Sequence, residues 1–244
     1  MNIRSLIKNP NNYIQKLKCR ITRFVRVYKY SGDTVTCENC LWLGQFFFNG
    51  ECPKCKSLPR TRLIPFSIDY FKLKSKNLSI LHVAPNLTEY NGVQFKLEQV
   101  KQYDRLDIKP IKHVNLIEDL SNLTLNDESY DLAIIWHVFE HIEEDLKAIS
   151  EVYRVLRPGG KLLMSVPIYP NGNLKTFEDK AILYKDYGHT HGHYDHCRSC
   201  GLDYYKRFES FGFSTETLNV NALNDDLILK YGLSKGHTVW CFTK

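Results

Sequence analysis

Short apolar runs separated by polar stretches follow one another along the chain from residue 79 onward. Helical stretches alternate with these runs, and this alternation is typical of a parallel sheet with helices on both faces. We therefore expect an α/β fold in this part of the chain. The five predicted strands are Ser79 to Val83, Val100 to Ile108, His113 to Ile117, Tyr130 to Trp136 and Lys161 to Pro167.

Between the fourth and fifth runs, residues Glu143 to Leu156 show helical periodicity, and Pro158-Gly159-Gly160 ends the predicted helix. Two later runs, Ser214 to Val220 and Thr238 to Phe242, are strand-like. They predict a terminal antiparallel hairpin, which brings the expected sheet to seven strands, most of them parallel.

The N-terminal region has a different pattern. Apolar residues recur every three or four positions from Tyr13 to Tyr28, and cations occupy most of the remaining positions, which predicts a basic amphipathic helix. We expect this helix to pack on its own domain with a solvated cationic face. The alternative is peripheral contact with an anionic membrane or with RNA. The apolar positions are Ile14, Leu17, Ile21, Phe24, Val25 and Tyr28.

Two CxxC pairs, Cys37/Cys40 and Cys52/Cys55, lie eleven residues apart. Zinc prefers four tetrahedral ligands, and each CxxC turn presents two thiolates to one ion. Two disulfides are the alternative, but in a reducing compartment this spacing indicates metal binding more often. We expect a structural zinc knuckle in residues 35–62, between a helical segment in 1–34 and a larger domain in 63–244.

The 244 residues can form one sizeable core and an appendage, and the longest apolar run is too short to span a membrane. Charges interrupt the N-terminus, so a signal peptide is not indicated and a cytoplasmic protein is expected. The net charge is +6, yet residues 1–30 hold eight cations and no acid, which leaves −2 for the remainder. A nucleic-acid footprint across the whole chain is therefore not indicated.

Three motifs together carry a family resemblance. An acid-headed strand at Tyr130-Asp131 leads to His137 and to Glu140-His141, and an R-V-L-R-P-G-G turn follows at residues 154–160. This order resembles a class I S-adenosylmethionine-dependent methyltransferase. The segments Leu81 to Asn86, Cys52 to Arg62 and Asp195 to Arg198 resemble a bacterial subgroup with L-H-x-A-P-E, C-P-x-C-x-S-x-x-R-x-R and D-H-x-R motifs.

The resemblance implies a Rossmann-like fold that binds S-adenosylmethionine beyond the carboxyl ends of the strands. Asp107 would accept hydrogen bonds from the ribose hydroxyls, and Asp119 with Leu120 would approach the adenine, although Asp119 could instead cap a helix. Most relatives have a glycine-rich loop after the first strand, whereas this chain has no glycine there before Gly92. The cofactor-binding residues implied are His82, Ala84, Pro85, Asn86, Asp107, Asp119, Leu120 and His137.

Histidines supply the candidate bases. His137 ends the fourth strand, where this fold faces the transferred methyl group, and His196 beside Asp195 is expected to be the general base. His193 and Arg198 are expected to bind substrate. Cys197 and Cys200 form a third CxxC near these histidines, which raises the alternative of a second metal site.

Three functions fit the sequence. The first is an enzyme that methylates oxygen or nitrogen of a small molecule or glycan intermediate by in-line transfer. The second is an RNA methyltransferase whose knuckle and basic tail hold the nucleic acid, and the third is a non-catalytic scaffold. Arg60 and Arg62, which follow the second CxxC of the knuckle, are expected to support substrate or cofactor binding.

Overall fold

The computed structural model describes residues 10–97 and 99–244. Its centre is a seven-stranded sheet with the order β5-β4-β3-β6-β7-β9-β8. The pairs from β5 to β7 are parallel, whereas β9 runs antiparallel to both β7 and β8. The strands are β3 (Ser79–Val83), β4 (Gln102–Asp107), β5 (Leu116–Ile117), β6 (Tyr130–Trp136), β7 (Leu156–Ser165), β8 (Ser214–Asn219) and β9 (Thr238–Thr243).

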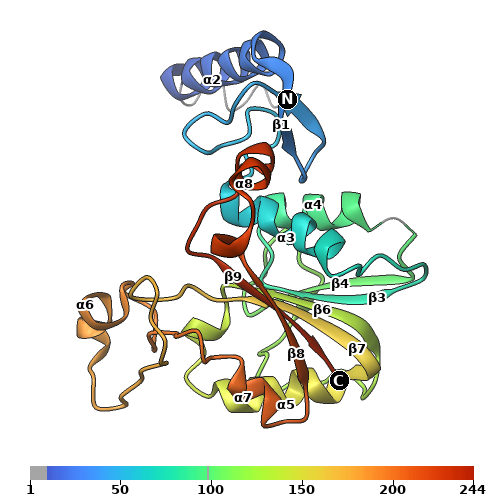
Figure 1. Cartoon of the computed structure of the whole chain (residues 1–244), viewed down its shortest axis with the longest axis vertical. Coiled ribbons are helices and arrows are strands. Elements are labelled where there is room, and N and C mark those ends of the chain that lie inside the picture. The colour runs from blue at the N-terminus through green and yellow to red at the C-terminus, as the bar shows by residue number, and fades with distance from the viewer. Residues whose placement is uncertain (1–9, 98) are drawn as a thin grey trace.

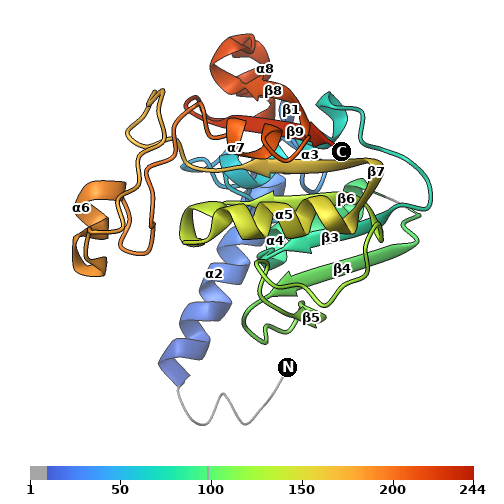
Figure 2. The same cartoon turned by 90° about the horizontal axis from the view of Figure 1, so that it is seen from below.

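Helices cover both faces of this sheet (Figure 1). One face carries α3 (Pro59–Tyr70), α4 (Leu87–Lys96) and α8 (Asp225–Tyr231). The other carries α5 (Asp145–Val155) and α7 (Lys206–Glu209), which lie nearest the viewer when the molecule is seen from below (Figure 2). Successive residues of the central strands alternate between two buried apolar cores, so Leu81 and Val83 pack on the α5 side and Ile80 on the α3 side.

This architecture confirms the expected mostly parallel α/β sheet with a terminal antiparallel hairpin. Strands β3 and β6 have the predicted bounds, and α5 ends at Val155, before the Pro-Gly-Gly turn. That turn is part of β7, which begins at Leu156 rather than at Lys161, with a register shift against β6. The edge strand β5 is reduced to two residues.

An insert between β7 and α7 stands apart from the sheet (Figure 1). It contains α6 (Tyr187–His191) and the predicted His193 to Arg198 segment. Isolated bridges from Ile168 to Cys200 and from Phe177 to Ser199 hold the two arms of the insert together. Short 3₁₀ helices occur at Phe139–His141, Tyr184–Asp186 and Val220–Ala222.

The knuckle is a separate small unit made of β1 (Ser31–Cys37), β2 (Trp42–Gly44) and the following loop, and it lies over α3, α4 and α8 (Figure 1). The helix α2 (Pro10–Lys29) precedes it and includes the predicted Tyr13 to Tyr28 helix. Residues 1–9 of the predicted N-terminal segment lie outside the described residues. Within the described ranges, no helix is long and apolar enough to cross a membrane.

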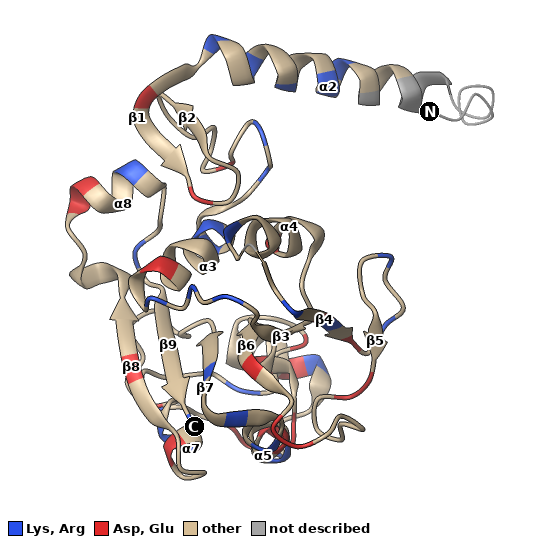
Figure 3. Cartoon of the chain, turned by 90° about the vertical axis from the view of Figure 1, so that its right-hand side faces the viewer, with Lys and Arg blue, Asp and Glu red and all other residues tan. Residues whose placement is uncertain are grey.

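The expectation that α2 packs its apolar face on its own domain is wrong. Its apolar side chains are exposed, by 63% at Phe24, and the helix extends away from the sheet (Figure 3). The knuckle instead contacts another side of α2, because Arg23 donates from Nε to the carbonyl of Pro53 at 2.8 Å.

Candidate functional site

Two non-glycine residues adopt left-handed backbone conformations at the ends of adjacent strands. Ala84 follows β3 with φ of 47°, and His137 follows β6 with φ of 55°. The strand order reverses between β3 and β6, so both residues lie at the switch point where open α/β sheets bind ligands. The Ala84 amide donates to Leu106 at 2.6 Å, and the His137 amide donates to Ser165 at 2.9 Å. Bonds to the neighbouring strands therefore hold this strained pair in place.

The conformation of Ala84 bears directly on the missing glycine. A glycine-rich loop owes its shape to positive φ values, which cost a residue with a Cβ about 1–2 kcal/mol. Ala84, with the smallest side chain after glycine, adopts such a value at this loop. The loop thus obtains a glycine-like turn without glycine.

Asn86 precedes α4 and caps its first turn. Its Oδ1 accepts hydrogen bonds from the amides of Thr88 at 2.9 Å and Glu89 at 3.0 Å, while Glu89 Oε2 accepts from the Asn86 amide at 3.1 Å. This reciprocal arrangement is a capping box. The side-chain oxygen of Asn86 is therefore engaged in directing the loop from β3 into α4.

The predicted ribose and adenine residues lie along the same edge. Asp107 is the last residue of β4, next to β3, and its Oδ1 accepts from the Lys109 amide at 2.9 Å. Asp119 is exposed after β5, and bonds from the amide and hydroxyl of Ser121 lower its pKa. These bonds form a turn rather than the helix cap considered as an alternative. Leu120 is buried in the core.

His82 does not reach this edge. Its side chain is fully buried inside the sheet, and Nδ1 shares a hydrogen bond of 2.8 Å with the Tyr103 hydroxyl. Burial lowers the pKa of His82 to about 3, so the ring stays neutral at physiological pH. The structure therefore does not support the predicted contact between His82 and the cofactor.

His137 faces a buried carboxylate. Its Nδ1 lies 3.5 Å from Oε1 of Glu140, a residue with 1% exposure. Within the described ranges, the buried atoms His137 Nε2, Glu140 Oε2 and Trp136 Nε1 have no hydrogen-bond partner. Buried polar atoms are normally satisfied, so this group at a strand edge is a candidate for contact with a ligand.

Glu140 also adjoins a cluster from the insert. Its Oε1 lies 3.8 Å from His141 Nε2, and His141 Nδ1 lies 3.4 Å from Asp195 Oδ1. Asp195 forms its short hydrogen bond with His193, whereas His196 contacts the rings of His141 and His193, with centroids 4.9 Å away in each case. The expected Asp195–His196 pair is thus an Asp195–His193 pair with His196 beside it. Two triads could hold a cation with ligand atoms within 4.8 Å, namely Glu140-His141-His196 and His193-Asp195-His196.

Arg198 has a different role from the one predicted. Its guanidinium is buried and donates to the carbonyls of Ile142 at 2.6 Å and Glu143 at 3.0 Å, to Phe139, and to Glu178 Oε2 at 2.9 Å. It therefore ties the insert to the loop after β6 and has no free face for substrate. The two cysteines of the third CxxC lie in different surroundings. Cys200 packs in the core, whereas Cys197 Sγ donates to the Glu140 carbonyl.

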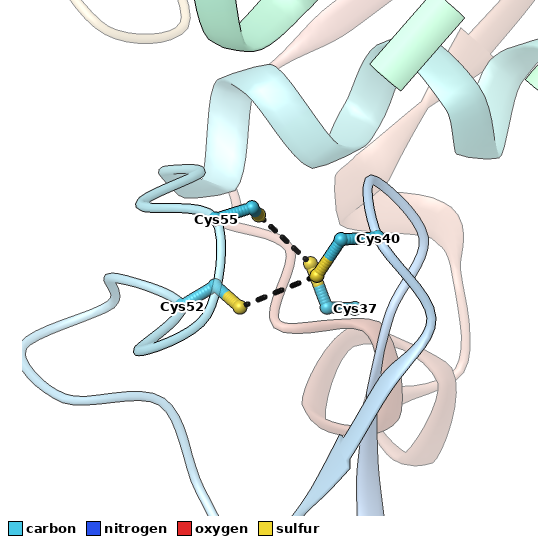
Figure 4. Close-up of side chains that lie close together, drawn as sticks. All are labelled: Cys37, Cys40, Cys52 and Cys55. Carbon is cyan, nitrogen blue, oxygen red and sulfur yellow. Dashed lines mark hydrogen bonds between the residues drawn. The ribbon is translucent and has the colours of Figure 1, made fainter. Parts of the chain in front are cut away.

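The four knuckle cysteines converge, as Figure 4 shows. Sγ of Cys37 lies 3.6 Å from Cys55, and Sγ of Cys40 lies 3.8 Å from Cys52. A tetrahedral ion with zinc–sulfur bonds of about 2.3 Å separates its ligands by about 3.8 Å. The sulfurs belong to different turns and are too far apart for disulfides, so this donor set fits one zinc ion.

Arg62 fixes the knuckle to the larger domain. It is fully buried and donates to the carbonyls of Gly50 at 2.9 Å, Tyr231 at 3.1 Å and Gly232 at 2.6 Å, and also to Ser57. The expected substrate or cofactor role of Arg62 is therefore wrong, since all of its N–H groups face inward. Arg60, two residues earlier on α3, is exposed.

A second contact joins the knuckle to α4 near the candidate site. Asn39 Nδ2 donates to the Thr88 carbonyl at 3.1 Å, and a Cβ on Gly92 would lie 1.7 Å from Asn39 Oδ1. Lys96 of α4 forms ion pairs with Glu38 of the knuckle and with Asp69 of α3. The knuckle thus holds the helix whose first turn lies at the candidate site.

Sequence reasoning missed Glu140 as a partner of His137 and Arg62 as a clamp. The i, i+3 spacing from His137 to Glu140 was the available signal for the first. Two surface hollows, of about 560 and 290 Å³, lie at the amino ends of the strands, beside Gln99 and Gly159, and neither coincides with the candidate site.

Comparison with known proteins gives a match over the central part of the chain. Residues 77–164 match the family model described as a methyltransferase domain. A "Probable S-adenosylmethionine-dependent methyltransferase" of Mycolicibacterium smegmatis is 42% identical over 66 residues, which cover 27% of this chain and 23% of that protein. The match thus spans about a quarter of the relative.

Solved structures share the fold. An S-adenosylmethionine-dependent methyltransferase from Archaeoglobus fulgidus has a TM-score of 0.52 at 13% identity and covers 75% of this chain and 94% of its own. One from Mesorhizobium loti has a TM-score of 0.50 at 14% identity, with coverages of 73% and 96%. The chain therefore shares its fold with these methyltransferases, and its residues 77–164 match a methyltransferase domain.

Proposed function

We propose that the chain transfers the methyl group of S-adenosylmethionine to an oxygen or nitrogen atom of a small molecule or glycan intermediate. The observation that carries this proposal is the His137–Glu140 pair at the switch point, where the buried atoms His137 Nε2 and Glu140 Oε2 lack hydrogen-bond partners within the described part of the chain. When bound, the cofactor supplies an electrophilic methyl group. The protein contributes binding, alignment and proton removal, and alignment alone can account for about 7–11 kcal/mol of the barrier.

The edge residues divide the binding task. Asp107 would accept bonds from the ribose hydroxyls, and the exposed Asp119 beside Leu120 would border the adenine. Ala84, Pro85 and Asn86 would lie alongside the methionine part of the cofactor, because their turn leads into the first amides of α4. These positions follow from the strand ends and the class I fold.

His137 is the general base in this proposal. Its Nε2 takes the proton of the attacking acceptor, while its Nδ1 faces Glu140 Oε1, which orients the ring. His196 remains the alternative base, since Asp195 already pairs with His193. The insert carrying His193 would border the acceptor, and the buried Arg198 would hold this insert in position.

Single-turnover methyl transfer from labelled S-adenosylmethionine across a panel of acceptors tests the proposal. His137→Asn and Glu140→Gln should each lower kcat at least about 10²-fold with little change in cofactor affinity. His189→Ala is a matched control, because His189 is exposed on α6. Unchanged kcat in both site variants would contradict the assignment of His137.

We also propose that one structural zinc ion occupies the site of Cys37, Cys40, Cys52 and Cys55. The sulfur geometry supports this, and the knuckle has a small apolar core of its own. Chelation should unfold the knuckle and, through Asn39 and Arg62, loosen the first turn of α4. Elemental analysis should find one zinc per chain, and a zinc-free protein with unchanged unfolding would count against the site.

A further inference from the structure

The apolar side of α2 has no covering within the described part of the chain. Six apolar side chains share one stripe along the helix, because their positions recur every three or four residues. Their exposed fractions range from 44% to 65%. The stripe, called the α2 stripe below, consists of Ile14, Leu17, Ile21, Phe24, Val25 and Tyr28.

The knuckle holds the opposite side of the same helix. Arg23 bonds to Pro53, the Arg26 guanidinium lies 4.7 Å from the centre of the Phe48 ring, and Val27 packs against the knuckle core. At about 100° per residue, these three positions face away from the middle of the α2 stripe. The anchored polar side therefore turns the apolar side outward.

Cations border the stripe. Residues 1–30 contain eight Lys and Arg residues and no acid. On the helix, Lys18 and Lys29 lie along one border of the stripe and Arg20 along the other, and Figure 3 shows basic but no acidic positions on α2. An exposed apolar stripe between cations matches the boundary between lipid headgroups and acyl chains in an anionic membrane.

We propose that α2 docks the protein on the surface of a membrane containing anionic lipids. The α2 stripe enters the headgroup boundary, and the bordering cations contact lipid phosphates. RNA would satisfy the cations but leave the apolar stripe in water, and a second copy would bring two strongly cationic helices together. The helix lies on the membrane, because its cations prevent it from spanning.

Co-sedimentation of the zinc-loaded 244-residue chain with vesicles tests this proposal. We expect binding to phosphatidylcholine vesicles that contain phosphatidylglycerol, reduced by added salt, and at least about tenfold weaker binding without phosphatidylglycerol. Phe24→Asp should weaken binding at least about tenfold, because it places a charge in the apolar stripe. Leu229→Asp is the matched control, since both side chains are 63% exposed, and it should bind as the unaltered protein does.

Lys18→Glu with Arg20→Glu provides a second test and should also weaken binding at least about tenfold, with unchanged thermal unfolding. Equal binding by the Phe24→Asp and unaltered proteins would overturn the proposal. So would salt-sensitive binding to single-stranded RNA without vesicle binding. A dimer in light scattering that Phe24→Asp dissociates, again without vesicle binding, would assign the stripe to self-association instead.

Discussion

Replacing Arg62 with alanine should destabilise the whole protein, although Arg62 lies outside the sheet. The side chain is fully buried, and its guanidinium joins carbonyls of the knuckle, Gly50 and Ser57, to those at the end of α8, Tyr231 and Gly232. Its charge also lies near the four cysteines of the proposed zinc site, whose thiols would become thiolates around the ion. The substitution therefore removes both the donors and the counter-charge from a closed site.

The magnitude follows from the number of groups left unpaired. Breaking a buried charged network by removing one partner costs about 3–5 kcal/mol. The loss of the contact with the Phe47 ring, 3.8 Å from the guanidinium carbon, adds to this cost. For a chain of this size, about 3–5 kcal/mol corresponds to a fall in Tm of about 6–20 °C. Arg62→Lys should recover part of the loss, because one ammonium cannot reach four carbonyls.

Thermal and urea unfolding of the zinc-loaded protein, followed by circular dichroism, measures this effect. Arg60→Ala is the matched control, since Arg60 is exposed on the same helix and should change the free energy of unfolding by less than about 0.5 kcal/mol. If Arg62→Ala unfolds at the same urea concentration as Arg60→Ala, the clamp carries no stability and the reasoning fails.

Three further predictions concern the cofactor edge and its supports. The pKa of His82 falls from 6.5 to about 3 on folding, so between these pH values the unfolded chain binds more protons than the folded one. The free energy of unfolding therefore drops by up to about 1.4 kcal/mol for each pH unit below 6.5. His82→Phe should lose this part of the pH dependence, which a comparison of urea midpoints near pH 7 and pH 5 measures. Gly92→Ala should cost about 1–3 kcal/mol in urea unfolding, because its Cβ meets Asn39, and an unchanged midpoint would show that the knuckle is not held at this contact. Asn86→Ala should cost about 1 kcal/mol and also weaken cofactor binding in calorimetry, whereas Asn224→Ala, which removes the cap of α8, should cost a similar amount and leave binding unchanged.

The sequence was sufficient to predict the bounds of the central strands but not those of the strands at the edges of the sheet. Strands β3 and β6 are buried and nearly continuous in apolar residues, so the pattern alone sets their bounds. β5 lies at the edge of the sheet, where only Leu116 and Ile117 pair with β4. The residues around these two are mostly polar, so no apolar pattern marks the ends of this strand. Sequence periodicity does not show how far such a pairing extends.

For the candidate site, the sequence placed residues at strand ends but did not reveal their partners. His137 and Asp107 lie at the predicted edge because parallel strands end together. The pairing of Asp195 with His193 depends on how the insert folds back. Arg62 and Arg198 are buried, whereas Arg60 is exposed, and only tertiary packing distinguishes arginines that clamp carbonyls from those available to ligands.

Calorimetric titration of S-adenosylhomocysteine into the zinc-loaded protein tests the cofactor site most directly. The account predicts micromolar binding that Asp107→Ala abolishes and that Asp127→Ala, at an exposed position 20 residues further along the chain, leaves intact. Absence of heat and of any thermal shift at millimolar ligand would contradict a functional cofactor edge and favour a non-catalytic scaffold.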